Sequence, residues 1–431
     1  MIMVRVVVLV LAIFTLASSA FAQAPQDGIV ALLVPGIDTA GQSKRTLGSN
    51  WCRLIESLRQ QGYRFGGVIR PNPVHIRLPD SLDRQPPGIQ VDDPRSANLF
   101  YIEPSSAANG DLTLRALEFA ECVREIVRFT GCSHIRPIPF SAGGLVVRLA
   151  IERAVPGIDD LPWIDRVIFI ATPHLGVGWA RNIPAIRGTP LTSLSPDSEL
   201  IVRLNALELP ESCDYASLVI RGIRDGATGG AGREYDRFTK KLSGFADLPP
   251  SYLQGGDEVV SVISSNLRFS PAAITFEQAT GRAVQSLVVR VAPSNDNWFS
   301  TDTIHSQALQ DATVQQWVAA LLACDRHFWS CPQGDSLEQL VALQARQAAF
   351  DVIEAQALNA NSFREVTKVD VQEFECTSHN GRNRTYRFRG QAQSRDYQPR
   401  ETLVEGTLEL KFDRFGRVTS SRQHIAKMSE P

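Results

Sequence analysis

The sequence predicts an α/β fold, with a mostly parallel sheet that helices cover on both faces. Residues 29–34 form a continuous apolar run, which is typical of a strand buried on both faces. Comparable strands are predicted further along the chain, at residues 98–102, 167–171, 217–220 and 287–291. Helical patterns lie between several of these strands, and such an alternation indicates parallel strands connected by helices.

The helices are predicted from apolar spacing and from residues that end helices. Apolar side chains recur at helical spacing in residues 49–59 and 112–129, and Gly62 and Gly131 follow these two stretches. A last helix is predicted at about residues 307–322. These helices would supply the layers that cover the sheet.

Three stretches interrupt the alternation of strands and helices. Residues 71–96 are rich in proline, residues 189–214 are irregular with proline and serine, and residues 224–250 contain a glycine-rich segment. Long insertions of this kind usually decorate a fold or form a lid over a site. We therefore expect loops in all three.

Ser141 follows a strand-like segment and precedes two glycines and an apolar helical stretch. This arrangement predicts a sharp strand-to-helix turn that carries Ser141. A hydroxyl is a weak nucleophile unless a base activates it, and such a turn exposes it to one. In the usual Gly-x-Ser-x-Gly pattern a glycine stands where this chain has Pro139. The alternative interpretation is an ordinary serine that caps a helix.

A candidate base and a candidate acid follow Ser141 along the chain. His305 lies between the last predicted core strand and the last helix, where a histidine can reach the serine turn. Asp257 lies on a glycine-rich loop, from which its carboxylate can orient an imidazole. Asp225, a few residues after a predicted strand, is a rival acid. Asp302 is a weaker rival because it is so close in sequence to His305.

Two backbone amides are candidates for an oxyanion hole. Residues 34–37 follow the first core strand, and an N–H there can act together with the N–H of the residue after the nucleophile. We therefore predict Ile37 and Ala142 as the donors. The alternative is a plain turn at the end of a strand.

These residues resemble those of the lipase-like α/β-hydrolases, including the triacylglycerol lipases and the GPI-inositol-deacylase-like branch. The resemblance covers about residues 29–322 and rests on five short sequences. They are Val34-Pro35-Gly36, Ser141-Ala142-Gly143-Gly144-Leu145-Val146-Val147-Arg148, Ala171-Thr172-Pro173-His174-Leu175-Gly176, Leu194-Ser195-Pro196-Asp197-Ser198 with Leu204-Asn205, and Gly256-Asp257-Glu258-Val259-Val260-Ser261. The third and the last are the most specific.

The resemblance implies an α/β-hydrolase fold with Ser141 as nucleophile, Asp257 as acid and His305 as base, in the chain order that this fold uses. The chain departs from the family's pattern at three positions: Pro139 for Gly, Pro35 for His and Glu258 for Gly. The resemblance does not include the C-terminal part of the chain.

Together these features predict a serine carboxylic-ester hydrolase of the lipase or esterase type, which acts through an acyl-enzyme on Ser141. Its substrate would be an ester or a lipid, and peripheral contact with lipid surfaces would fit that role. The alternatives are a phospholipase, deacylase or acyltransferase with the same triad, and an inactive hydrolase fold that binds a lipid or a partner. No cofactor or metal is expected, because no His, Asp or Cys cluster has metal-ligand spacing.

The N-terminus has the parts of a secretory signal peptide. Arg5 provides the positive region, residues 6–16 the apolar core, and Ala20-Phe21-Ala22 the small-residue cleavage site. A membrane span needs about 20 apolar residues, so this shorter run favours a signal peptide over an anchor. We expect residues 1–22 to be removed and the protein to be secreted or periplasmic.

The rest of the chain is long enough for two domains. We expect a catalytic domain over residues 23–331 and a small α+β domain of unknown role over residues 332–431. The second is predicted from a helical pattern at residues 337–358 and from strand-like runs at 363–376, 385–389 and 402–412. Hairpin turns would connect these strand-like runs into an antiparallel sheet.

Charge and cysteines limit the other expectations. The formal net charge is -2, so the chain has no electrostatic footprint for nucleic acid. An exported protein can form disulfides. The chain has 7 cysteines, and because this number is odd, at least one cysteine stays free or pairs between chains. Cys324 and Cys331 form the easiest pair by sequence separation.

Overall fold

The computed structural model describes residues 28–37, 49–71, 75–76, 89–105, 110–178, 180, 190–222, 256–257, 259–291, 304–324, 330–360, 365–395 and 401–429. The chain forms two compact units, each built from several segments. Unit 1 comprises Met1–Thr172, Arg203–Leu218 and Ala308–Arg326. Unit 2 comprises Pro173–Val202, Val219–Gln307 and His327–Pro431.

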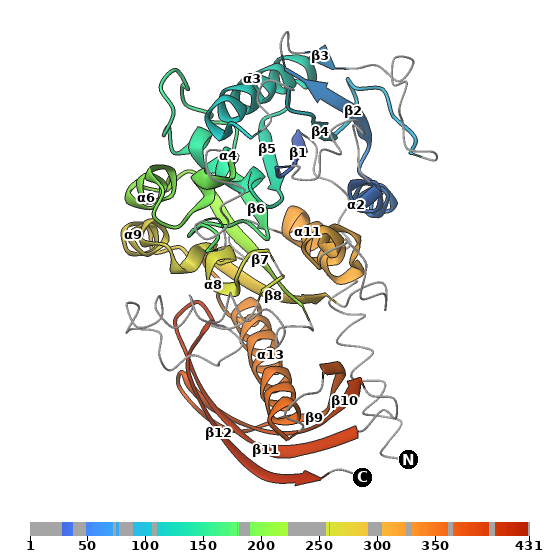
Figure 1. Ribbon diagram of the computed structural model, residues 1–431, viewed down its shortest axis with the longest axis vertical. Helices are drawn as coiled ribbons and strands as arrows, with labels where there is room; N and C mark the ends of the chain where they lie inside the picture. The colour runs from blue at the N-terminus through green and yellow to red at the C-terminus, as the bar shows by residue number, and fades with distance from the viewer. Residues whose placement is uncertain are drawn as a thin grey trace. The chain divides into compact units, whose positions relative to one another are not determined.

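A five-stranded sheet forms the centre of unit 1 (Figure 1). Its order is β3-β2-β4-β1-β5, with β1 Ile29–Val34, β2 Phe65–Arg70, β3 His75–Ile76, β4 Leu99–Ile102 and β5 His134–Pro139. β1 pairs in parallel with β4 and β5, and β2 with β4, whereas β3 is antiparallel to β2. Every residue of β1 is buried, as predicted for a strand covered on both faces.

The five-stranded sheet is not joined to the next strand of the chain by a continuous series of backbone hydrogen bonds. Two prolines explain this interruption. Two isolated bridges connect the β5 segment to that of β6 (Arg166–Ile170). The amides of Ile135 and Ser141 donate to carbonyls on the β6 side, at 2.7 and 2.9 Å. Backbone donors alternate between the two sides of a strand, so Pro137 and Pro139 occupy the intervening positions that face β6 and have no N–H to donate.

A second sheet has the order β6-β7-β8, with β7 Asp214–Gly222 and β8 Gln285–Val291. β6 pairs in parallel with β7, from Arg166 opposite Asp214 to Ile170 opposite Leu218. Parallel strands with intervening helices therefore confirm the predicted α/β class.

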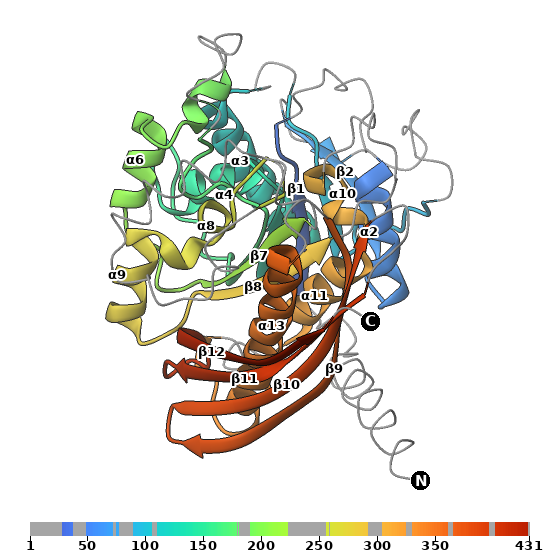
Figure 2. The same ribbon diagram turned by 60° about the horizontal axis from the view of Figure 1, so that its bottom comes forward.

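Helices cover both faces of the strands in unit 1. α3 (Leu112–Thr130) and α4 (Gly143–Ile151) lie together on one side, and α2 (Ser49–Gln60) and α11 (Ala312–Ala323) on the other (Figures 1 and 2). α3 has the predicted ending, since Gly131 adopts a φ of 69° and its amide donates to a carbonyl of the last turn.

Two sequence expectations about helices need correction. The helix predicted over about residues 307–322 is present as α11 but begins later, at Ala312, and is preceded by α10 (Ile304–Gln307) and a short 3-10 turn. Asp311 causes this later start, because its carboxylate caps the start of α11. The stretch expected to be irregular contains α6 (Glu199–Ala206), and the Ser198 hydroxyl accepts from its first turn at 3.3 Å.

Unit 2 contains an antiparallel sheet at the C-terminal end of the chain, where three strand-like runs were predicted, and a fourth strand, β12 (Val418–Ser429), completes it. The strand order is β12-β11-β10-β9, with β9 Glu365–Asn380, β10 Asn383–Arg395 and β11 Glu401–Phe412. The helix α13 (Asp335–Ala360) packs along it (Figure 2). Alanines of α13 face the sheet, and Gly390 leaves room for Ile353, which a Cβ atom there would meet.

Buried ion pairs join α13 to strands β7 and β8 within unit 2. Arg221 lies 3.3 Å from Asp351 and 3.3 Å from Glu354. Arg290 on β8 also pairs with Glu354, at 2.6 Å for one of its two contacts. All four side chains are nearly excluded from solvent, so each charge depends on its partners.

Several expectations concern residues outside the described ranges. These include the signal peptide at residues 1–22 and most of the insertions at 71–96 and 224–250. Among the described helices, none combines the length and apolar character that crossing a membrane requires. All seven cysteines are described and none is in a disulfide, so the Cys324–Cys331 pair is not formed in this structure.

Candidate active site

Ser141 lies in the turn between β5 and α4 and has a left-handed backbone, with a φ of 54°. Such a φ is uncommon for a residue with a side chain and is found at functional turns. The amide of Gly143 donates to the carbonyl of Phe140 at 2.9 Å, and that of Gly144 to the carbonyl of Ser141 at 3.0 Å. The N-cap position of α4 belongs to Ala142, so Ser141 is not the capping serine of the alternative interpretation.

Glycines allow three segments to pack tightly around this turn. A Cβ atom on Gly36 would lie 2.8 Å from the Cβ of Ser141, and one on Gly143 would lie 2.5 Å from the carbonyl oxygen of Pro35. A Cβ atom on Gly144 would collide with the side chain of Thr172. A side chain on Gly143 or Gly144 would therefore collide with its neighbours, so both positions require glycine.

Pro139 does not prevent the turn from forming. It is the last residue of β5, and the hydrogen bonds of the turn begin at the next residue, Phe140. The missing donor of Pro139 faces the interrupted side of the strand described above. Proline at this position therefore removes one hydrogen bond between neighbouring strands, and Ser141 still adopts its left-handed backbone conformation.

The two predicted oxyanion donors lie in unit 1 with Ser141. Ala142 is helical, with a φ of −59°, and directly follows the serine. Ile37 follows Gly36, the residue that packs against Ser141. Within the described residues, no acceptor receives a hydrogen bond from either amide.

Asp257 and His305 form a hydrogen-bonded pair in unit 2. The Oδ2 atom of Asp257 lies 2.5 Å from the Nδ1 atom of His305, and the amide of His305 donates to the carbonyl of Asp257 at 3.1 Å. The other carboxylate oxygen, Oδ1, accepts from the amides of Val259 and Val260 at 3.1 and 2.7 Å. Asp257 is 1% exposed. Backbone donors thus fix the carboxylate, which in turn orients the imidazole.

The end of β7 packs against both loops that carry this pair. The amide of Gly222 donates to the carbonyl of Gly256 at 2.8 Å. The side chain of Ile304 packs against the α-carbon of Gly222, and a Cβ atom on Gly222 would collide with it. Gly222 therefore holds the residue before the candidate acid and the residue before the candidate base against one strand end.

The structure brings the predicted residues together in two groups. Ser141, Ala142 and Ile37 belong to unit 1, and Asp257 and His305 belong to unit 2. The rival acids Asp225 and Asp302, and Glu258, lie outside the described residues. The described part of the chain contains no group of three or more His, Cys, Asp or Glu side chains arranged to hold a metal ion.

One charged residue beside the Ser141 group was not predicted from the sequence. Arg115 is buried on α3 and donates to the carbonyls of Pro35 and Gly36. A signal existed, because Arg115 interrupts the buried face that also includes Leu112, Ala116 and Phe119. A charged residue in an apolar stripe needs buried partners, and the sequence does not name them.

Comparisons with known proteins find distant structural likenesses. No protein-family model matches the sequence, and no curated protein matches it. The product of the gene lin2722 from Listeria innocua is 11% identical, with a TM-score of 0.40 over 70% of this chain and 96% of that chain. Phospholipase PlaB from Legionella pneumophila is 14% identical, with a TM-score of 0.40 over 79% of this chain and 66% of that chain.

A lipase is also among the similar structures. Lipase BlEst2 from Bacillus licheniformis, in its propeptide form, is 13% identical, with a TM-score of 0.42. The match covers 70% of this chain and 52% of that chain. Likenesses this distant assign neither a family nor an activity to the chain.

Proposed function

We propose that this protein is a serine carboxylic-ester hydrolase of the lipase or esterase type. The observation that carries the proposal is the left-handed backbone of Ser141 between a strand and a helix. The two amides of Ile37 and Ala142 and the pair of Asp257 with His305 support it, because they supply the other groups that acyl transfer requires.

The proposed reaction begins when the Ser141 hydroxyl oxygen attacks the ester carbonyl carbon. His305 takes the hydroxyl proton through Nε2, because its Nδ1 is engaged by Asp257. The carbonyl π electrons move to oxygen, and the Ile37 and Ala142 amides stabilise that oxyanion. Collapse expels the alcohol, which receives the proton from His305, and leaves an acyl group on Ser141.

Water then completes the proposed cycle. His305 takes a proton from a water molecule, whose oxygen attacks the acyl carbon. The bond to Ser141 breaks, and the serine oxygen recovers a proton from the imidazolium. An alcohol in place of water would give an acyltransferase, so the ratio of hydrolysis to transfer separates the two activities.

Covalent labelling tests the proposal. A fluorophosphonate probe is expected to add one phosphonyl group to the protein, and peptide mass spectrometry should locate it on Ser141. The Ser141→Ala variant should take up no label. A folded protein that resists the probe and hydrolyses neither p-nitrophenyl butyrate nor a phospholipid would support the inactive binding fold instead.

We also propose that residues 1–22 act as a signal peptide. The support is the charged, apolar and small-residue regions of that segment. When the full chain is expressed in a bacterium, the exported protein should begin at Gln23. Retention of Met1 on protein recovered from the membrane would indicate an anchor.

A further inference from the structure

Arg115 makes an unusual pair of contacts for a buried arginine. It is 4% exposed, and its guanidinium donates through Nη1 to the carbonyl of Gly36 at 3.1 Å and through Nη2 to the carbonyl of Pro35 at 2.5 Å. Burial of a charge is costly unless hydrogen bonds compensate for it. Two successive carbonyls of the loop after β1 therefore have their orientations set by one side chain.

The contact of Arg115 with the Gly36 carbonyl bears directly on a candidate oxyanion donor. The carbonyl of Gly36 and the N–H of Ile37 belong to the same peptide group. That group is planar, and in the trans form its C=O and N–H point in opposite directions. A donor that fixes the Gly36 oxygen therefore fixes the direction of the Ile37 N–H.

The same contact also changes how strongly the amide can donate. A cation at the carbonyl oxygen withdraws electron density from the peptide group, and hydrogen bonds in a chain strengthen one another by roughly 10–30%. The loop lies beside the nucleophile, since a Cβ atom on Gly36 would lie 2.8 Å from the Ser141 Cβ. Arg115 thus orients and polarises a peptide group at the place where the oxyanion would form.

We propose that Arg115 is a positioning residue for the oxyanion hole: it aligns and polarises the Gly36–Ile37 peptide so that the Ile37 amide stabilises the charge of the transition state. This inference rests on the proposed function, because it assigns Arg115 a role in the same reaction. Arg115 itself does not contact the substrate in this account and acts through the loop.

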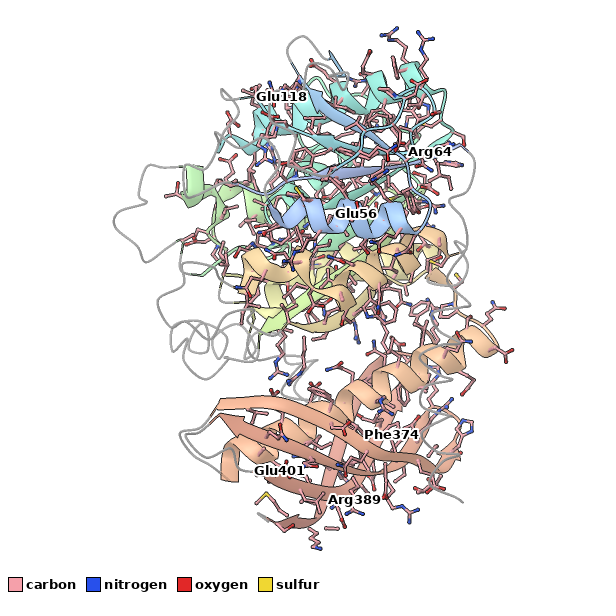
Figure 3. All side chains as sticks on the ribbon, turned by 90° about the vertical axis from the view of Figure 1, so that its right-hand side faces the viewer. Glu56, Arg64, Glu118, Phe374, Arg389 and Glu401 are labelled. Carbon is pink, nitrogen blue, oxygen red and sulfur yellow. The ribbon has the colours of Figure 1, made fainter. Side chains whose placement is uncertain are left out.

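Arg115 stays charged although it is buried. Burial lowers its pKa to about 10, while Tyr101 and Glu118 act in the opposite direction. The guanidinium is therefore a cation at neutral pH. Glu118, also on α3 and labelled in Figure 3, is buried, and its Oε2 accepts from the Ser105 amide at 3.1 Å. Removal of Arg115 alone would take away a positive charge that interacts with that carboxylate.

Steady-state kinetics of Arg115→Met with p-nitrophenyl butyrate test the inference. We expect kcat to fall about 10- to 100-fold with KM nearly unchanged, because a misdirected donor affects the transition state more than the bound substrate. Affinity for a trifluoromethyl ketone, which mimics the tetrahedral state, should fall by the same factor as kcat/KM. Arg115→Lys should recover part of the loss, since an ammonium can still donate to one carbonyl.

Three further variants make the result decisive. Arg128→Met removes an exposed arginine of the same helix and should leave both constants unchanged. Glu118→Gln should retain most activity because it keeps the Arg115 contacts. Arg115→Met combined with Glu118→Gln removes both buried charges, and this double variant decides the question if Arg115→Met does not fold.

Two outcomes would overturn the inference. One is a folded Arg115→Met protein, single or double, with the kcat of the unsubstituted enzyme. The other is a loss that appears only in KM, with inhibitor affinity unchanged. Failure of the proposed function is recognised separately, because either the unsubstituted protein would then hydrolyse neither p-nitrophenyl butyrate nor a phospholipid, or Ser141→Ala would retain full esterase activity.

Discussion

Gly36 and Ser141 lie so close together that there is no room for a side chain on the glycine. The backbone of Gly36 has no positive φ, so other residues could adopt its conformation, and the constraint is purely steric. The adjacent Gly143 is confined in the same way by the carbonyl of Pro35. At the residue scale, small side chains permit the serine turn and the oxyanion loop to approach each other.

Gly36→Ala tests this steric requirement. The new methyl group must displace either Ser141 or the loop, and a displacement of about 1 Å can reduce turnover about 100-fold. We expect kcat for p-nitrophenyl butyrate to fall at least about 10-fold in a folded protein. Gly406→Ala, an equally crowded glycine of the C-terminal sheet, is the matched control and should affect stability without changing kcat per folded molecule. Equal kcat losses in both variants would argue against a local effect.

Individual residues differed in how far the sequence could predict them. Asp257 and His305 were expected to pair from loop position and family resemblance, and the structure places their side chains 2.5 Å apart. Their catalytic roles remain a prediction. Arg115 was not expected, because its partners are main-chain carbonyls about eighty residues earlier in the chain. Helix periodicity shows that such a residue is buried but does not show what it contacts.

Elements with strong local signals were predicted closely. α3 has apolar periodicity and a terminal glycine, and its observed bounds, Leu112–Thr130, extend the prediction by one residue. β2 and α6 were not predicted. β2 contains Gly66 and Gly67, and α6 lies in a segment rich in proline and serine, so neither has a clear local pattern. Their structure depends on packing against distant parts of the chain.

The element α13 has two faces with different functions in the fold. Its alanines and Ile353 pack on the C-terminal sheet, while Asp351 and Glu354 pair with arginines of β7 and β8. Arg221 immediately precedes Gly222, which packs against the loops of the candidate acid and base. The helix thus secures the strand end from which those loops are supported.

Glu354→Ala should destabilise the protein more than a comparable change elsewhere on α13. Removal of one partner from a buried charge cluster costs about 3–5 kcal/mol in the free energy of unfolding. Glu338→Ala breaks the pair with Arg384, where the glutamate is 56% exposed, and should cost at most about 1 kcal/mol. Urea denaturation measures both values. Similar losses in the two variants would show that the buried cluster does not stabilise the fold as described.

At the scale of the whole molecule, the predicted catalytic residues are divided between the two compact units. The nucleophile and oxyanion loop belong to unit 1, and the acid and base belong to unit 2, which also includes the C-terminal sheet. The sequence suggested a separate C-terminal domain because residue patterns change after Cys331. Residue patterns could not show that α13 shares buried charges with β7 and β8, since these contacts join positions 130 and 64 residues apart.

A double-mutant cycle on Ser141 and His305 tests the central claim most directly. If the serine and the histidine act as one nucleophile–base pair, Ser141→Ala and His305→Ala should each reduce kcat for p-nitrophenyl butyrate about 10⁴-fold or more, and the double variant should lose little beyond either. Both single variants should remain folded by circular dichroism. Losses that multiply in the double variant, or a Ser141→Ala protein with undiminished turnover, would contradict the account.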